Sequence, residues 1–431
     1  MLAFGLAVLL GAVLLSLPIS RTGPGGAPFT TALFTSTSAV CVTGLTVVDT
    51  PSYWSGFGEA VILGMIQVGG FGIMTFASLL GILVSRRMGL RTRLNAAAET
   101  KAVGPGDVKG VVVGVVKISV VFEVVTATLL TTRFLVGYDE PMGRALYLGV
   151  FHAVSAFNNA GFALYSDSLV GFVEDPWIGL PIAMAVIAGG LGFPVIMELR
   201  RELRSHRRWS LHTKMTLATT GALLVGGAAF VTASEWSNPG TLGALSPPGR
   251  LLAGFFHAVM PRTAGFAALD YGEMTDGTLL GTTVLMFIGG GSAGTAGGIK
   301  VTTFMLLLFV IVAEVRGRRR VNAFDRQIDD RVTRQALTVA LLSVAAVMTS
   351  TLVLLQLTTH PIRDVLFEAT SAFGTVGLST GITAGLPTTA QLVLVGLMFL
   401  GRLGPITLVS ALALRERQLF YELPEGRPII G

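Results

Sequence analysis

Long apolar stretches alternate with short polar stretches along the whole chain. The apolar stretches hold about 20 residues each, enough for a helix to cross the roughly 30 Å of hydrocarbon in a bilayer. Between successive pairs of them lie shorter amphipathic stretches that end in small or hydroxyl residues and a glycine. This pattern predicts an all-α polytopic membrane protein with short segments that enter the membrane and turn back.

One of these short stretches occurs in four similar copies, each between two long apolar stretches. The copies begin at Phe34, Phe151, Phe256 and Phe367 and reach a glycine at Gly44, Gly161, Gly265 and Gly377. The four glycines are 117, 104 and 112 residues apart. We therefore divide the chain into four repeats, 1–100, 101–210, 211–330 and 331–431, the last of which includes a cytosolic tail.

Each repeat is predicted to contain a first membrane helix (M1), a short pore helix with its turn (P) and a second membrane helix (M2). In the order M1, P, M2, the predicted segments are 2–19, 28–46 and 57–84; 109–136, 144–164 and 177–199; 213–235, 248–267 and 277–315; and 333–358, 361–380 and 388–414. The first segment has no basic region before it and no Ala-x-Ala site after it, so a retained helix is favoured over a signal peptide.

The composition agrees with a membrane protein. Hydrophobic residues make up 52% of the 431 and charged residues 13%, whereas charged residues supply about a quarter of an ordinary soluble domain. The mean hydropathy is +0.71. The single cysteine, Cys41, excludes an intrachain disulfide and a cysteine-rich metal site, and we expect it to be a packing residue. The net charge of +6 alone is compatible with nucleic-acid binding, but the positions of the charges are not.

Basic residues gather after each predicted M2 helix. Six lie in 85–110, six in 200–214, seven in 316–334 and three in 415–427, which accounts for 22 of the 31 Lys and Arg. By the positive-inside rule these segments and both termini are cytosolic, and the P segments enter from outside. The predicted outer side holds 13 of the 25 acids and attracts cations, although any single acid is more simply explained as part of a solvated surface. Its bases are Arg21, Arg133, Arg144, Arg250, Arg262 and Arg363.

Four non-helical turns at membrane depth suit a dehydrated cation, because such backbone is tolerated only where it is buried in protein or lines a watery cavity. If the turns meet on one pseudo-fourfold axis, as in a K+ channel, their carbonyls can replace the water shell of an ion. Each pore helix would point the negative end of its dipole at this pathway. The alternative, that the glycines are helix-packing sites, does not account for the polar residues beside them: Thr43, Asn158, Asn159, Thr263 and Thr375.

At this point the sequence resembles a known family. The M1–P–M2 repeats with Val42-Thr43-Gly44-Leu45 and Thr375-Val376-Gly377-Leu378 look like the Trk/Ktr/HKT superfamily of potassium transporters over essentially the whole chain. The eight-helix plan and residues 41–50 are most similar to the KtrB-type membrane subunits of bacterial Ktr systems. Some plant relatives favour sodium where the first filter glycine is serine; all four positions here are glycine, which supports potassium.

The resemblance implies potassium uptake across the bacterial cytoplasmic (inner) membrane, often stimulated by sodium. It implies a homodimer with one pore in each subunit, regulated by a cytosolic ATP/ADP-binding ring of the KtrA type, and no enzymatic activity or covalently bound cofactor. It also assigns K+ to the carbonyls of twelve residues: Val42, Thr43, Gly44, Asn159, Ala160, Gly161, Thr263, Ala264, Gly265, Thr375, Val376 and Gly377.

The predicted M2 helices share a glycine motif that repeat three breaks. Val68–Gly72, Ala188–Gly192 and Leu400–Gly404 align, whereas 288–298 is a run of glycine, serine and threonine that does not suit a continuous helix. We predict a flexible loop at about 289–298, under the filter, where the resembling superfamily has an intramembrane gating loop. A phosphate-binding loop is the competing interpretation, which membrane depth disfavours. The candidate gating residues in the loop are Gly290, Gly291, Ser292, Gly294, Thr295, Gly297 and Gly298.

Arg402 completes the candidate gating set. It stands where repeats one and two have Gly70 and Gly190. A cationic side chain inside a membrane is costly and usually faces the bundle interior or water. We therefore expect Arg402 to repel ions on the axis and to hold the loop by hydrogen bonds to the carbonyls of the loop. The alternative is a buried arginine that pairs with an acid elsewhere. Lys300 is equally compatible with anchoring the loop and with reaching towards the membrane surface.

Four further polar positions have simpler interpretations. His152 and His257 occupy equivalent places in two pore helices, and without nearby Cys or Asp they are predicted to be hydrogen-bonding scaffolds rather than metal ligands. Lys117 and Glu123 are six residues apart and do not share a helix face well. Structural pairing with neighbouring helices is therefore favoured over proton coupling.

Other functions stay open at this point. A sodium pore or a non-selective monovalent cation pore would use the same four turns. An alternating-access carrier for a small solute would use broken helices and often inverted repeats, but the four repeats here share one orientation. The basic segments 200–208 and 316–320 are predicted to dock an acidic partner or anionic lipid headgroups.

Overall fold

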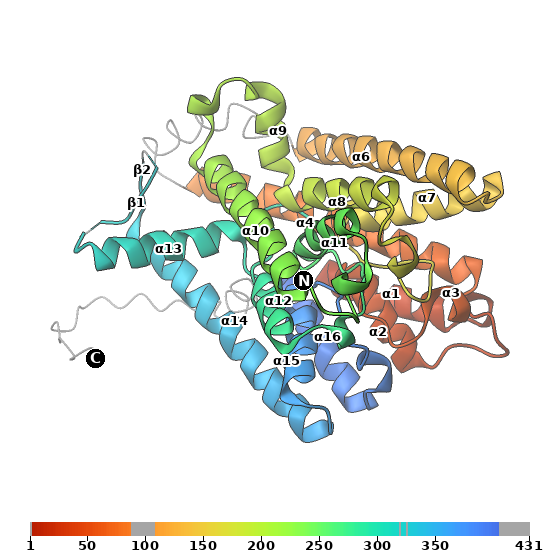
Figure 1. Cartoon of the computed structure of the whole chain (residues 1–431). Helices are drawn as coiled ribbons and strands as arrows, with labels where there is room; N and C mark the ends of the chain where they lie inside the picture. Colours follow the sequence, from red (N-terminus) through yellow and green to blue (C-terminus); the bar gives the residue numbers. More distant parts are fainter. Residues whose placement is uncertain (1, 88–107, 319, 325, 405–431) are drawn as a thin grey trace.

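The computed structural model describes residues 2–87, 108–318, 320–324 and 326–404. Its helices follow one another in the order that the four repeats predict (Figure 1). Residues 405–414 of the last predicted M2 helix lie outside the described residues. In the described part, three helices are long and apolar enough to cross a membrane, and a bent pair of helices makes a fourth span: Gly110–Gly137, Leu211–Glu235, Asp330–Leu357, and Pro176–Leu191 with Phe193–Glu202.

Repeats one and two each begin with a helix that packs along the pore helix of the same repeat. Repeat one contains α1 (Leu2–Ser16), the pore helix α2 (Phe29–Val40), α3 (Thr50–Tyr53) and α4 (Gly56–Arg87). Repeat two contains α6 (Val108–Gly137), the pore helix α7 (Met142–Phe157), α8 (Pro176–Leu191) and α9 (Phe193–Glu202).

Repeats three and four follow the same plan, with the second membrane helix of repeat three in two pieces. Repeat three contains α10 (Leu211–Glu235), the pore helix α11 (Pro247–Val259), α12 (Asp276–Phe287), α13 (Val301–Val315) and an antiparallel hairpin of β1 (Asn322–Ala323) and β2 (Arg326–Gln327). Repeat four contains α14 (Asp330–Leu357), the pore helix α15 (Ile362–Gly374) and α16 (Thr388–Leu403). Short 3-10 helices in the connections are Pro18–Ser20, Val170–Phe172, His206–Arg208, Leu242–Ala244, Tyr271–Glu273 and Thr383–Gly385.

Local sequence sets where several helices begin. At the start of α8 the Asp175 side chain accepts a hydrogen bond from the Trp177 amide, and at the start of α11 Ser246 accepts one from the Gly249 amide. Each cap is followed by proline in the first turn, where a missing N–H group costs nothing. These caps fix the outer ends of both helices.

The predicted M2 helix 177–199 is not continuous. It is divided at Gly192 into α8 and α9, whose axes differ by 99°. Gly192 has a φ of 93°, which residues with a β-carbon rarely adopt, and a proline occupies the first turn of α9. The chain therefore turns sharply before its basic residues Arg200 and Arg201.

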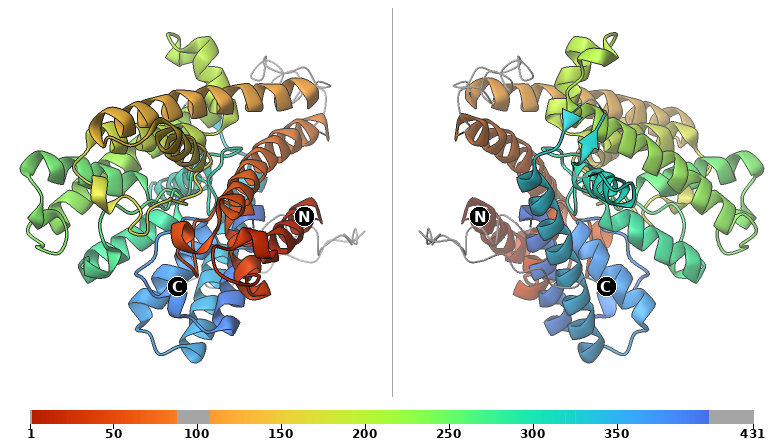
Figure 2. Two further views of the ribbon diagram at one scale, coloured as in Figure 1. Left: turned by 90° about the vertical axis from the view of Figure 1, so that its right-hand side faces the viewer. Right: turned by 90° about the vertical axis from the view of Figure 1, so that its left-hand side faces the viewer.

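Neighbouring repeats contact each other in a closed order. Repeat one touches repeat two through α4 with α6 and α7, and repeat two touches repeat three through α8 with α11. Repeat three touches repeat four through α12 with α15, and α16 of repeat four returns to α2 of repeat one. Figure 2 shows the four repeats, in red, orange to yellow, green and blue, as sectors around a common centre. This closed order of contacts is consistent with the pseudo-fourfold arrangement that the sequence predicts.

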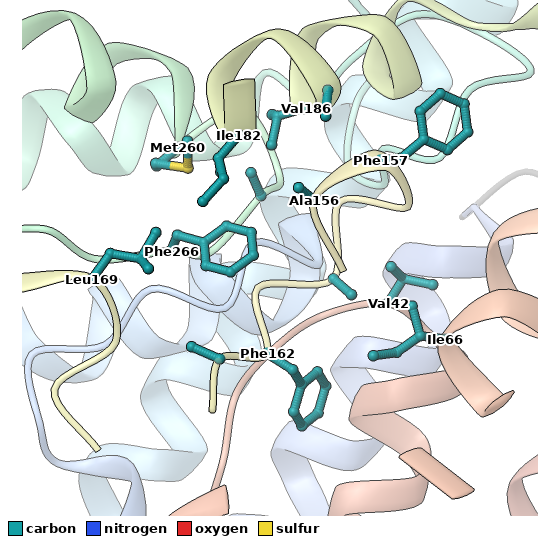
Figure 3. Packing of buried hydrophobic residues seen from close by; sticks show 14 of the residues in the cluster. Val42, Ile66, Ala156, Phe157, Phe162, Leu169, Ile182, Val186, Met260 and Phe266 are labelled. Carbon is teal, nitrogen blue, oxygen red and sulfur yellow. The ribbon is translucent and has the colours of Figure 1, made fainter. Parts of the chain in front are cut away.

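Apolar side chains fill the space between the repeats. The large apolar residue after each filter glycine is buried, with exposed fractions of 0–1% for Leu45, Phe162, Phe266 and Leu378. Close packing of these side chains anchors the chain where it leaves each turn. Figure 3 shows this packing around the turns of repeats one to three, with Val42, Ile66, Ala156, Phe157, Phe162, Leu169, Ile182, Val186, Met260 and Phe266 labelled.

Candidate ion-conduction site

The four turns after the pore helices have the same backbone conformation. In each turn the glycine shared by the four copies has a positive φ, between 71° and 92°, and so does the residue two positions before it. These earlier residues carry side chains, and positive φ values cost such residues about 1–3 kcal/mol unless the surroundings impose them. They are Val42 (56°), Asn159 (59°), Thr263 (71°) and Thr375 (49°).

The glycines of the four turns meet in a closed ring. A β-carbon added to any one of them would overlap the carbonyl oxygen that precedes the glycine of the next repeat. The pairs run once around the centre: Gly44 with Ala160, Gly161 with Ala264, Gly265 with Val376, and Gly377 with Thr43. Four segments far apart in the sequence are therefore brought to one axis, and only glycine fits at this level of each turn.

Hydroxyl and backbone groups of the pore helices hold three of the turns. In repeat one the Thr43 amide donates to the Ser38 carbonyl at 2.7 Å, and the Gly44 amide donates to the Ser38 hydroxyl at 3.0 Å. In repeat four the Val376 amide donates to the Ser371 carbonyl and the Gly377 amide donates to the Ser371 hydroxyl. In repeat two the Ala160 amide donates to the Ser155 carbonyl. Sequence reasoning missed these serines, although a serine stands six residues before the glycine in three of the four copies.

The glycine motif of the M2 helices brings each of them against a pore helix. A β-carbon at the first glycine of the motif would overlap a carbonyl at the end of the pore helix in the same repeat. The pairs are Gly69 with Val40, Gly189 with Phe157, and Gly401 with Phe373. The carbonyl ends of these pore helices are therefore fixed near the turns, where their dipoles favour a cation.

The predicted break in repeat three is present. No helix spans residues 288–300 between α12 and α13, and the two ends of this loop pair through a bridge between Ile288 and Ile299. The loop lies against the turn of repeat four, since a β-carbon at Gly297 would overlap the Thr375 hydroxyl. The structure thus has the loop beside the turns, as the sequence predicts; its flexibility stays a prediction.

The break between α8 and α9 and the loop satisfy each other's backbone groups. Gly291 and Thr295 donate their amides to the carbonyls of Gly190 and Gly189, at 2.7 and 3.1 Å. In return the Phe193 amide at the start of α9 donates to the Ala293 carbonyl at 3.1 Å. Unpaired backbone groups are costly inside a membrane. Each irregular segment therefore supplies hydrogen-bond partners for backbone groups that the other leaves unpaired.

Arg402 is buried beneath the turns and holds the loop. Its guanidinium donates to the carbonyl of Thr295 in the loop and, at 3.1 Å, to the carbonyl of Gly69 in α4. Its exposed fraction is 3%, and no carboxylate in the described part of the chain forms a salt bridge with it. The contact with loop carbonyls is therefore present, and the alternative of an acidic partner finds no support. Lys300 also contacts the loop, because its ammonium donates to the Ala296 carbonyl.

The other buried polar side chains brace the pore helices. His152 accepts a hydrogen bond from the Leu164 amide at 3.3 Å, and His257 lies 2.9 Å from the Tyr271 hydroxyl. Among the described residues no three His, Cys, Asp or Glu side chains gather as a metal site would require. Glu123 accepts hydrogen bonds from Gln67 and Asn158, which ties α4, α6 and α7 together. Glu123 therefore pairs with polar side chains of neighbouring helices, as the sequence analysis favours.

The outer surface differs from the prediction in two ways. Arg262, assigned to the outside, is buried under the turn of repeat three with an exposed fraction of 6%. The positive-inside rule counts charges in loops and carries no information on depth. In addition, Asp175, an acid of the predicted outer loops, is buried, and so are four acids inside the predicted helices or pore segments: Glu59, Glu235, Asp364 and Glu368.

Exposed acids remain on the loops at the outer ends of the pore helices. Glu174 accepts hydrogen bonds from the hydroxyl and amide of Ser246, and these bonds hold the pKa of that carboxyl below its usual range. It therefore stays charged at neutral pH and joins the outer loop of repeat two to α11. Other exposed acids in these loops are Asp49, Asp139, Asp167, Asp270 and Glu273. Such a surface raises the local concentration of cations.

Comparisons with known proteins agree with this geometry. A family profile described as TrkH, cation transport protein, matches residues 20–420. The chain belongs to the TrkH family of cation transport proteins. It is therefore a multi-pass membrane transport protein rather than an enzyme.

Several curated proteins match essentially the whole chain. It is 41% identical to Ktr system potassium uptake protein B of Bacillus subtilis, over 100% of this chain and 95% of that protein. It is 37% identical to the protein of the same name from Vibrio alginolyticus, over 100% and 94%. It is 35% identical to the potassium/sodium uptake protein NtpJ of Enterococcus hirae, over 99% and 95%.

A solved structure confirms the fold class. The crystal structure of the potassium transporter TrkH from Vibrio parahaemolyticus superposes with a TM-score of 0.72, covering 95% of this chain and 84% of that chain. Sequence identity across the match is 18%, so this likeness concerns the fold. The predicted all-α membrane architecture is thereby confirmed.

Proposed function

We propose that this protein takes up potassium across the bacterial cytoplasmic membrane through the passage formed by its four turns. One observation carries the proposal: four turns with the same strained backbone meet in a closed ring of glycines and carbonyls. Carbonyls fixed in this way can replace the water shell of an ion without charged side chains. Relatives named as potassium uptake proteins match the whole length of the chain.

In this proposal the three residues of each turn bind K+ through their carbonyls, from 42–44, 159–161, 263–265 and 375–377. The loop 288–300 is the gate on the cytosolic side, and Arg402 holds it closed. What supports the gate is the position of the loop beside the turn of repeat four and its hydrogen bond from Arg402. To open the gate, the loop must leave the carbonyls of α8 that its amides contact.

The proposal extends to assembly and regulation. Relatives of this chain are named as components of Ktr systems, which supports a homodimer that works with a cytosolic ATP/ADP-binding ring. The basic segments 200–208 and 316–320 are the surfaces proposed to meet that ring or anionic lipid. Both termini are proposed to be cytosolic, which the charge pattern supports. Sodium is proposed as an activator rather than as the main transported ion.

Growth of a bacterium that lacks its own potassium uptake systems tests the proposed function. Cells that produce this protein are expected to grow in low potassium, where cells with an empty plasmid do not, and added sodium is expected to increase the growth rate. The relevant comparison uses equal amounts of protein in the membrane. Absence of growth despite confirmed membrane insertion would contradict potassium uptake.

A second candidate, a pore for both sodium and potassium, is favoured by one relative named as a potassium/sodium uptake protein. The two candidates are separated by rubidium uptake into liposomes that contain the purified protein. Selective potassium transport predicts that external potassium suppresses rubidium uptake and that equal sodium does not. Equal suppression by both ions would favour the non-selective pore.

A further inference from the structure

Repeat three departs from the other repeats at two places. Its M2 helix is broken by the loop 288–300, and an arginine stands three residues before its filter glycine. The other repeats have small or neutral residues at that position, namely Cys41, Asn158 and Gly374. The two departures meet in space: the Arg262 guanidinium donates to the carbonyl of Gly289, the second residue of the loop, at 3.1 Å.

The Arg262 guanidinium is buried and has few hydrogen-bond partners. Arg262 has an exposed fraction of 6%, and one of its terminal nitrogens, Nη1, is buried without a hydrogen-bond partner. Within the described residues no carboxylate forms a salt bridge with it. A buried guanidinium that lacks an acidic partner depends on the carbonyls around it. The carbonyl that it has belongs to a loop whose backbone is not protected by helical hydrogen bonds.

Arg262 and Arg402 hold the loop at two separate points. Arg262 contacts Gly289 where the chain leaves α12, and Arg402 contacts Thr295, just past the middle of the loop. The two arginines come from different repeats, so the loop is fixed between repeats three and four. Arg262 also precedes Thr263, a residue of the filter turn with a φ of 71°. One peptide unit therefore separates the side chain that holds the loop from the carbonyls of the turn.

We infer that Arg262 is a second latch of the loop, a positioning residue that keeps the gate closed and links it to the turn of repeat three. The inference rests on the proposed function, because it assigns a regulator to the same gate. Opening the loop must separate the Gly289 carbonyl from the guanidinium, which then needs water as a replacement. Loss of Arg262 is therefore expected to favour the open loop, as we also expect for loss of Arg402, while the filter glycines keep their ring.

Labelling of a cysteine in the loop measures this opening directly. Ser292→Cys places a thiol in the loop, and a charged thiol reagent is added to inverted membrane vesicles, in which the cytosolic face is outside. The single natural cysteine is fully buried, and vesicles without Ser292→Cys give its background. Arg262→Gln is expected to increase the labelling rate about tenfold, since a lost hydrogen bond to a charged group shifts an equilibrium by that order.

Arg250→Gln is the matched control. Arg250 also donates to three backbone carbonyls, those of Leu245, Trp236 and Gly243, but in the outer loop of the same repeat. Its loss is expected to leave the labelling rate of the loop unchanged, and Arg402→Ala serves as the positive control. Arg262→Lys keeps the charge with a single donor group, and we expect an intermediate rate. It also provides the test if the glutamine variant does not reach the membrane.

Two results would overturn the latch. One is a wild-type labelling rate in whichever Arg262 variant reaches the membrane, alongside faster labelling in Arg402→Ala. The other is a loss of discrimination between potassium and sodium with unchanged labelling, which would make Arg262 a support of the turn alone. The labelling result does not depend on transport by the wild-type protein, whereas the discrimination result is compared with wild-type transport. Failure of the proposed function is recognised separately, by absence of potassium uptake in the wild type.

Discussion

Alanine in place of Gly377 is expected to lower potassium uptake at low concentration by about 10- to 100-fold. The added β-carbon would overlap the Thr43 carbonyl oxygen of the next turn, and the residue has a φ of 92°. The turn must move to admit it, which displaces carbonyls that are proposed to bind the ion. The range corresponds to about 1–3 kcal/mol of lost ion stabilisation. Concentration-dependent rubidium uptake by whole cells measures the effect.

Gly381→Ala is the control for backbone strain. Gly381 has a φ of 93° in the same repeat, but no atom lies within 4 Å of an added β-carbon. Both variants therefore introduce strain from an unfavourable φ, and only Gly377→Ala also disturbs a neighbouring turn. Uptake by Gly381→Ala is expected to stay close to that of the wild type. Equal losses in the two variants would mean that strain, rather than the ring of turns, accounts for the effect.

Removal of Arg402 is expected to raise ion flux about tenfold. Arg402→Ala deletes two hydrogen bonds: one ties α16 to the loop through the Thr295 carbonyl, and the other ties α16 to α4 through the Gly69 carbonyl. It also removes a buried positive charge close to the turns. A lost bond of this charged kind shifts the opening equilibrium by about this factor. Thallium or rubidium flux into liposomes with the purified protein, without any partner subunit, is the measurement.

The comparison variant for this experiment is Arg334→Ala. Arg334 is exposed near the start of α14, so its loss changes the net charge equally without touching the loop. Its flux is expected to match that of the wild type. Unchanged flux through Arg402→Ala, in protein that remains folded by gel filtration, would remove Arg402 from the gate.

Much of this architecture could be predicted because the repeats carry local signals. The four glycines mark turns where only glycine fits, and repetition at near-equal spacing separates them from ordinary packing glycines. The run of glycines in 288–298 excludes a continuous helix on propensity alone. Arg402 was predicted to contact loop carbonyls because it replaces a glycine in an aligned motif, and the structure has that contact.

Other features depend on three-dimensional contacts that composition does not contain. The bend at Gly192 had a local signal, a glycine followed two residues later by Pro194, but the apolar run on both sides favoured one long helix. Its cause is the loop of repeat three, whose backbone pairs with the broken ends. Arg262 was assigned to the outside because charge counting treats it as a loop residue, whereas its side chain turns inwards to Gly289.

The ring of turns is tested most directly by locating the ion itself. We expect a structure determined with rubidium or thallium to show anomalous density on the axis of the four turns, within coordination distance of main-chain carbonyls from all four repeats. Density in which each ion touches carbonyls of one or two repeats only, or lies solely against acidic side chains of the outer loops, would contradict the account.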